Sequence, residues 1–140
     1  TKKLLEVATR FADLLVDVFG SGKHQGTSGH PEVELALVKL YHATGNAAYL
    51  DLAKTFVDRR GKGMMRGLGW MQAEYHQDRV PVRDEDIIEG HAVRAVYLNA
   101  GVADLYLETG EDALLVSLER QWRDMTRGKI FVTGGLGSRY

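Results

Sequence analysis

The chain has 140 residues, 44% of them apolar, a formal net charge of −1 and no cysteine. This size and composition suit one globular domain over residues 1–140, and the charge gives no electrostatic basis for binding nucleic acid or a membrane surface. Disulfides and thiolate metal sites are excluded without cysteine, and the apolar runs are shorter than the roughly 20 residues of a membrane span. No signal peptide is visible, so we expect a cytoplasmic protein with a truncated N-terminus, because the first residue is not Met.

Three helices are predicted in the first part of the chain. Apolar residues at helical spacing indicate a one-sided helix over 2–19. Pro31 suits the first turn of a second helix, 31–44, which is almost continuously apolar. A third helix, 46–60, is one-sided, and we expect Arg59 and Arg60 on its water-facing side.

A long irregular stretch, 61–86, follows and contains Trp70, Tyr75, His76 and Gln77. Loops of this length are uncommon in compact domains and are often functional, and the aromatic residues favour an ordered loop. Aromatic rings stack on sugar faces and side-chain amides bond hydroxyl groups, so these residues suit a carbohydrate site. They could equally pack the loop onto the helices.

Two more helices, 88–109 and 111–127, complete the pattern. The first is apolar on nearly every face, which predicts that it is covered on all sides. The second has a stripe of apolar residues that includes Leu114 and Trp122. Residues 129–133 could form a short strand before a glycine-rich turn.

The sequence contains an internal repeat, since residues 40–45 (LYHATG) match residues 105–110 (LYLETG). Each copy lies between a nearly apolar helix and a one-sided helix. Repeated helical pairs predict an all-α fold of stacked α/α hairpins, either an arc of an α/α toroid or a solenoid. Five helices do not close a toroid, and an open arc would leave apolar helix sides exposed, so we expect self-association.

Two histidines occupy equivalent places in this repeat, because His30 and His91 each stand at the start of a nearly apolar helix. Imidazoles there could bond sugar hydroxyls or carry protons, or they could simply satisfy a helix start. Arg94 lies one turn after His91 and could reach the same place. We expect it instead to form an ion pair with an acid in the segment 84–89.

Four segments together resemble glycoside hydrolase family 127, the β-L-arabinofuranosidase-like proteins: GHPEVE at 29–34, YHQD at 75–78, GHAVR at 90–94 and TGGLGSR at 133–139. The resemblance implies an (α/α)6 barrel, of which this chain would be an arc. It implies release of non-reducing-end β-L-arabinofuranose with retention of configuration. It also implies that His30, His91, Tyr75 and His76 bind substrate.

In that family the nucleophile is a cysteine held on zinc, and a glutamate is the acid/base, so the resemblance places these groups outside this chain. We therefore expect no catalytic residue, metal ligand or bound cofactor here and no activity from the isolated chain. Arg79 stands where the family pattern has histidine. The alternatives are a non-catalytic α/α-repeat binding module and an arc of an unsaturated-uronide hydrolase-like barrel, whose site would centre on Asp.

Overall fold

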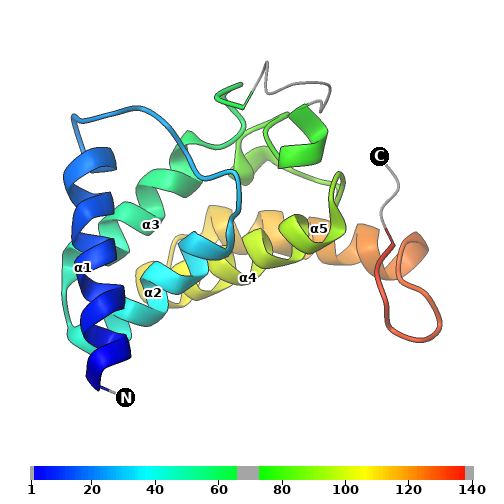
Figure 1. The fold of residues 1–140 in the computed structure, drawn as a ribbon. Coiled ribbons are helices and arrows are strands. Elements are labelled where there is room, and N and C mark those ends of the chain that lie inside the picture. The colour runs from blue at the N-terminus through cyan, green and yellow to red at the C-terminus, as the bar shows by residue number, and fades with distance from the viewer. Residues whose placement is uncertain (1, 66–72, 138–140) are drawn as a thin grey trace.

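A computed structural model describes residues 2–65 and 73–137 and confirms an all-α fold (Figure 1). In these ranges there is no named β-strand. The helices are α1 (Lys2–Phe19), α2 (Glu32–Thr44), α3 (Ala47–Arg59), α4 (Ala92–Thr109) and α5 (Asp112–Gly128), with short 3-10 helices η1 (Ala73–His76) and η2 (Val82–Asp84) between α3 and α4. No helix in the described ranges is long and apolar enough to cross a membrane.

The two copies of the sequence repeat end α2 and α4 with the same hydrogen bonds. The Thr44 hydroxyl donates to the Leu40 carbonyl at 2.7 Å, and the Gly45 N–H donates to the Tyr41 carbonyl. Thr109 and Gly110 make the same two bonds at the end of α4. Each helix therefore turns into the next as an α/α hairpin, α2–α3 and α4–α5.

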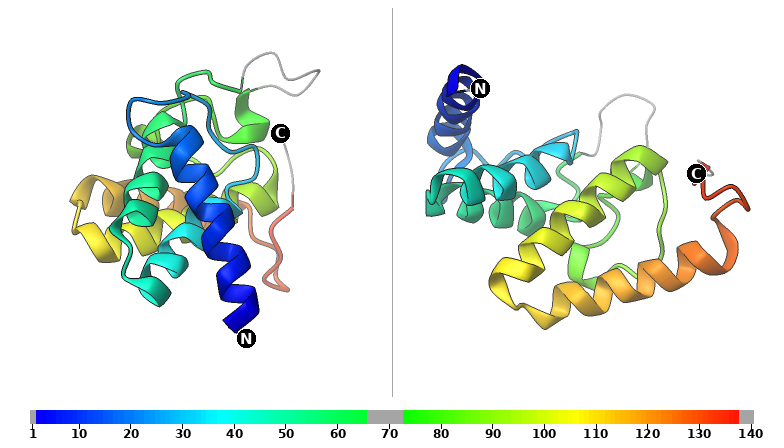
Figure 2. Two further views of the ribbon diagram at one scale, coloured as in Figure 1. Left: turned by 60° about the vertical axis from the view of Figure 1, so that its left-hand side comes forward. Right: turned by 90° about the horizontal axis from the view of Figure 1, so that it is seen from below.

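The two hairpins meet through α2 and α4, which lie side by side in both views of Figure 2. They approach closely at Gly101, where an added Cβ would lie 3.0 Å from the Leu35 nitrogen and 3.4 Å from the Glu34 carbonyl carbon. A side chain there would push the helices apart, because such distances are tighter than ordinary van der Waals contact. The missing side chain thus lets the first turn of α2 pack closely against the middle of α4.

Two apolar clusters stabilise this arrangement. One joins α1, α2 and α3, and the other joins α3, η2, α4 and α5. Their buried members are, respectively, Ala12, Leu37, Val38, Tyr49, Leu52, Ala53 and Phe56, and Val57, Val82, Leu98, Val102, Leu105 and Leu114. Burial of apolar surface on this scale is the main favourable contribution to folding.

The expectation that the fourth helix is covered on all sides is wrong for this chain. Along α4, Val93, Val96 and Tyr97 are 52%, 46% and 42% exposed. Helix α1 also turns much of its apolar side to solvent, with Phe11 60% exposed. The apolar surface of α1 and α4 is therefore larger than the described helices cover.

Other expectations are corrected at the level of single residues. Helix α4 begins at Ala92 rather than at 88, because His91 is the extended residue before its first turn. Segment 129–133 forms only an isolated bridge between Ile130 and Leu136. Trp122 is 62% exposed, while the polar Gln121 beside it is buried. Arg59 and Arg60, expected in water, are buried.

Candidate functional site

The segments before α2 and α4 meet the short helix η1 and bring together the residues expected to bind substrate. His30 precedes α2, His91 caps α4, and Tyr75 and His76 belong to η1. Trp70, Ser138 and Arg139 lie outside the described residues. The resulting group of side chains, together with Arg94, is called the histidine cluster below.

Arg94 is the centre of the histidine cluster. Its Nε donates to the Gly29 carbonyl at 3.0 Å, and its Nη2 lies 3.3 Å from Nε2 of His30. Its guanidinium carbon lies 4.7 Å from the centre of the Tyr75 ring, a cation–π distance. The expected ion pair with an acid in the segment 84–89 is wrong: Arg94 points to the start of α2.

The aromatic rings of the cluster pack edge to face around Tyr75. Its ring centre lies 5.3 Å from that of His91 and 5.0 Å from that of His76. His91 also accepts, through Nδ1, a 3.5 Å hydrogen bond from the backbone N–H of Arg94, so it caps the helix. The two roles weighed for His91, helix cap and site residue, are compatible in this geometry.

His76 is the most enclosed member of the cluster, 5% exposed. Among the described residues, neither of its ring nitrogens has a hydrogen-bond partner. Burial lowers the pKa of His76, and the positive charges of Arg94 and Arg60 lower it further. His76 is therefore a neutral imidazole, with one donor nitrogen and one acceptor nitrogen that are both buried.

Gly90 sets the position of His91 relative to η1. Its φ of 75° lies in the left-handed region, and an added Cβ would lie 1.9 Å from the Glu74 carbonyl oxygen. The close approach lets the His91 N–H donate to the Tyr75 carbonyl at 3.3 Å. Gln77 joins the same two segments, because its side-chain amide donates to the carbonyls of Tyr75 and Glu89.

A buried ion pair next to the cluster was not predicted from the sequence. Arg60 donates to Glu34 at 2.9 Å, and neither side chain is accessible to solvent beyond 1%. Arg60 also donates to the carbonyls of His76 and Ser28, and the Ser28 hydroxyl donates to Glu34. The signal in the sequence was Glu34 itself, which lies three and four residues before the buried Leu37 and Val38 and thus on the same helix face.

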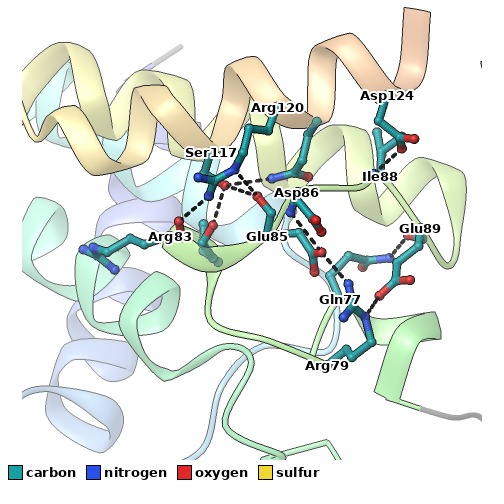
Figure 3. Close-up of polar contacts among 12 residues, drawn as sticks. Gln77, Arg79, Arg83, Glu85, Asp86, Ile88, Glu89, Ser117, Arg120 and Asp124 are labelled. Carbon is teal, nitrogen blue, oxygen red and sulfur yellow. Dashed lines mark hydrogen bonds and ion pairs between the residues drawn. The ribbon is translucent and has the colours of Figure 1, made fainter. Parts of the chain in front are cut away.

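Helix α5 holds the loop that leads to His91 (Figure 3). The Ser117 hydroxyl donates to the carbonyls of Val82 and Glu85, and Arg120 donates to the carbonyls of Arg83 and Glu85. These bonds satisfy loop carbonyls that would otherwise be buried without partners. They explain why the buried face of α5 carries serine and glutamine where an apolar stripe was expected.

Arg79, the residue that departs from the family pattern, lies in this loop and binds both Glu85 and Glu89 (Figure 3). Burial raises the pKa of Glu85, which outweighs the lowering by Arg79, and Glu89 raises it further. Bonding to Glu89 raises the pKa of Arg79, so the guanidinium stays charged. Arg79 thus links two acids of the loop and, among the described residues, does not bond to the histidine cluster.

The histidine cluster is open to solvent on the His30 side, where that side chain is 73% exposed. Two hollows of about 580 and 540 Å³ lie elsewhere, one along α4 and α5 and the other between the start of α4 and the turn near Leu136. Within the described ranges there is no group of three or more His, Cys, Asp or Glu side chains placed to hold a metal ion. The cluster offers imidazole and aromatic surfaces to a polar ligand but does not enclose it.

Comparison with known proteins agrees with this picture. A family model described as "Beta-L-arabinofuranosidase, GH127 catalytic domain" matches residues 1–140. A non-reducing end β-L-arabinofuranosidase of Bifidobacterium longum subsp. longum is 38% identical over 98% of this chain and 23% of its own length. The chain therefore spans about a quarter of that relative.

Solved structures give the same relationship in three dimensions. A GH127 β-L-arabinofuranosidase from Geobacillus stearothermophilus T6 matches 99% of this chain and 24% of its own, with 35% identity and a TM-score of 0.87. The GH127 β-arabinofuranosidase BT3674 matches all of this chain and 22% of its own, with 36% identity and a TM-score of 0.88.

Proposed function

Because the chain belongs to the GH127 family of β-L-arabinofuranosidase catalytic domains, we propose that it forms one arc of an (α/α)6 barrel in a glycoside hydrolase. The hydrolase would release β-L-arabinofuranose from the non-reducing end of arabinofuranosides. Family membership separates the chain from unsaturated-uronide hydrolases. The exposed apolar sides of α1 and α4 support the arc, since further helices of a barrel would cover them.

The observation that carries the proposed role is the histidine cluster itself. His30 precedes α2 and contacts the Arg94 side chain, while His91 caps α4 and packs against the Tyr75 ring. The Tyr75 ring packs against Arg94, His91 and His76, and His76 has a buried donor and a buried acceptor that a hydroxyl group entering the cluster would satisfy. We propose that these four residues form one wall of the sugar site, binding and orienting the arabinofuranose ring.

The zinc that the family resemblance implies does not fit the residues of this chain. The sequence has no cysteine, and the described residues contain no group that could hold a metal ion. We therefore assign no zinc ligand and no chemical step to these 140 residues. Nucleophile, acid/base and metal site would come from other parts of a full-length hydrolase, and the isolated chain would not hydrolyse glycosides.

A chimera tests the proposal. This chain would replace the matching quarter of the Bifidobacterium longum enzyme, and hydrolysis of nitrophenyl β-L-arabinofuranoside would be measured. We expect activity, and we expect His30→Ala or His91→Ala to lower kcat/KM roughly tenfold or more through the lost hydrogen bond. His42→Ala is the matched control, because His42 binds Glu108 at the opposite end of α2.

A folded chimera in which both variants keep full activity would contradict the role given to the two histidines. Hydrolysis by the isolated chain would contradict the assignment of the catalytic groups to other parts of the protein. A chain that binds methyl β-L-arabinofuranoside but gives only inactive, folded chimeras would instead favour the non-catalytic binding module.

A further inference from the structure

Arg94 contacts two histidines, His30 through its side chain and His91 through its backbone, and the two contacts have opposite consequences. A guanidinium has only donors, so Nε2 of His30, 3.3 Å from Nη2 of Arg94, must accept. In a neutral imidazole the other nitrogen then carries the hydrogen. His30 therefore presents Nδ1–H, and that nitrogen lies 3.9 Å from the buried Oε2 of Glu32, which has no hydrogen-bond partner among the described residues.

At His91 the pattern is reversed. Its Nδ1 accepts the hydrogen bond from the backbone N–H of Arg94 that caps α4. Neutral His91 therefore carries its hydrogen on Nε2. The backbone bond would be present with any side chain at position 94 except proline, whereas the contact to His30 needs a donor at the end of a long side chain.

The guanidinium is held in a fixed orientation, which is what allows it to select a tautomer. Its Nε donates to the Gly29 carbonyl at 3.0 Å, directly before His30, and its plane is held by the contact with the Tyr75 ring. Because these two contacts already restrain the planar guanidinium, it loses little further conformational entropy when it donates to His30. A lysine ammonium has no planar fork, so the same contacts would not fix its orientation.

We propose that Arg94 is a positioning residue that fixes His30 and His91 in opposite neutral tautomers, so that the pair presents two N–H donors, Nδ1–H and Nε2–H. The ligand chemistry that fits two N–H donors is a set of oxygen lone pairs, as on sugar hydroxyls. While Arg94 occupies Nε2 of His30, this histidine orients a ligand and does not relay protons through that nitrogen. The tautomers rest on the geometry alone, and the sugar as their ligand rests on the proposed function.

Nitrogen-15 NMR distinguishes the two tautomers directly. Long-range proton–nitrogen spectra of the labelled chain would be recorded at about pH 8, where an ordinary histidine is neutral. The five histidines would be assigned with His30→Gln and His91→Gln. We expect the Nδ1–H pattern for His30, which is the less common one in free histidine, and the Nε2–H pattern for His91.

The substitution Arg94→Met isolates the side-chain effect. His30 should revert to the Nε2–H pattern, while His91 keeps its own because the backbone N–H remains. Arg123→Met is the matched control, since Arg123 is an exposed arginine of α5 that pairs with Glu119 on the same helix. It should change neither histidine.

The Nε2–H pattern for His30 in the unsubstituted chain would overturn the proposal, whether or not the variants fold. An unchanged His30 pattern in folded Arg94→Met would also overturn it. The chimera separates this proposal from the function: tautomers as expected, together with full activity of the chimeric His30→Ala and His91→Ala variants, would count against the proposed function alone.

Discussion

Glu34 and Arg60 form a 2.9 Å ion pair in a place where neither side chain reaches solvent. The pair joins the first turn of α2 to the end of α3, and its hydrogen bonds continue to Ser28 and to the carbonyl of His76. A buried charge that loses its partner is costly, because the interior cannot solvate it. Loss of either partner would therefore leave an unpaired buried charge next to the segment that carries His76.

Breaking this pair gives the first prediction. Arg60→Met should lower the free energy of unfolding by about 3–5 kcal/mol, because it leaves the buried Glu34 carboxylate without a counter-charge, bonded only by the Ser28 hydroxyl among its described partners. Urea unfolding followed by circular dichroism would measure the loss. The exposed pair of Glu119 and Arg123 is the control, and Arg123→Met should cost less than about 1 kcal/mol. Equal effects at the two sites would contradict the importance of burial.

The second prediction concerns pH and His76. Burial and the charges of Arg94 and Arg60 lower the pKa of His76 in the folded state below its ordinary value of 6.5. As the pH falls through about 6.5, the unfolded chain takes up a proton that the folded chain does not, so the free energy of unfolding decreases. The loss should continue down to the lowered pKa of the folded state.

His76→Asn should reduce this loss of stability between about pH 7 and pH 5, and urea unfolding at a series of pH values would show it. His24→Asn changes an exposed histidine and serves as the control. A steeper decline for the His76 variant than for the unsubstituted chain would show that the sign is wrong.

Gly90→Ala gives the third prediction. The new Cβ would collide with the Glu74 carbonyl oxygen, and φ there is 75°, so we expect a loss of more than about 2 kcal/mol. Gly110→Ala is matched in φ, at 65°, but meets nothing within 4 Å, and should cost only about 1–2 kcal/mol. Thermal unfolding of the two variants would compare them. A smaller loss at position 90 than at 110 would show that η1 moves aside freely.

Self-association of the isolated chain is the fourth prediction. Val93, Val96 and Tyr97 form an exposed apolar strip on α4, and such strips favour contact between copies. Sedimentation velocity should show species larger than a monomer at high concentration, and Val96→Glu should shift them toward monomer. Leu107→Glu, at the far end of α4, should have less effect. A monomer at every concentration, without binding of an apolar dye, would contradict the prediction.

Much of the fold could be predicted because local signals agree with it. Pro31, Gly45 and Gly110 mark helix ends, and four helices were predicted to within one residue at each end. The pairing of hairpins followed from the repeated LYxxTG segment, whose end bonds are the same in both copies. These features depend on neighbours in the sequence.

The features that were missed depend on partners far along the chain. Arg60 follows four residues of mixed polarity, a pattern that predicts a helix end exposed to solvent. In the structure Arg60 is buried because it pairs with Glu34. Ser117 and Gln121 break the apolar stripe of α5 because their partners are Val82, Glu85 and Asn99. Periodicity counts apolar positions and cannot reveal which backbone carbonyls will need a donor.

The candidate site divides in the same way. The sequence and its family resemblance predicted the identity of His30, His91, Tyr75 and His76, and the structure brings them together, while their binding role stays a prediction. Arg94 was assigned to the wrong partner, because acids nearby in the sequence suggested an ion pair. Two of those acids, Glu85 and Glu89, instead bind Arg79.

Gly101 has a consequence for the evolution of the site. It lies seven residues after Arg94, about 10 Å along α4 at the usual rise, and touches α2 near Leu35. A methyl group at this point would push α2 and α4 apart and widen the distance between Arg94 and His30. Selection for the proposed sugar site would therefore also act on Gly101, which contacts neither histidine. The effect of Gly101→Ala would measure how strongly the site geometry depends on the packing of α2 against α4.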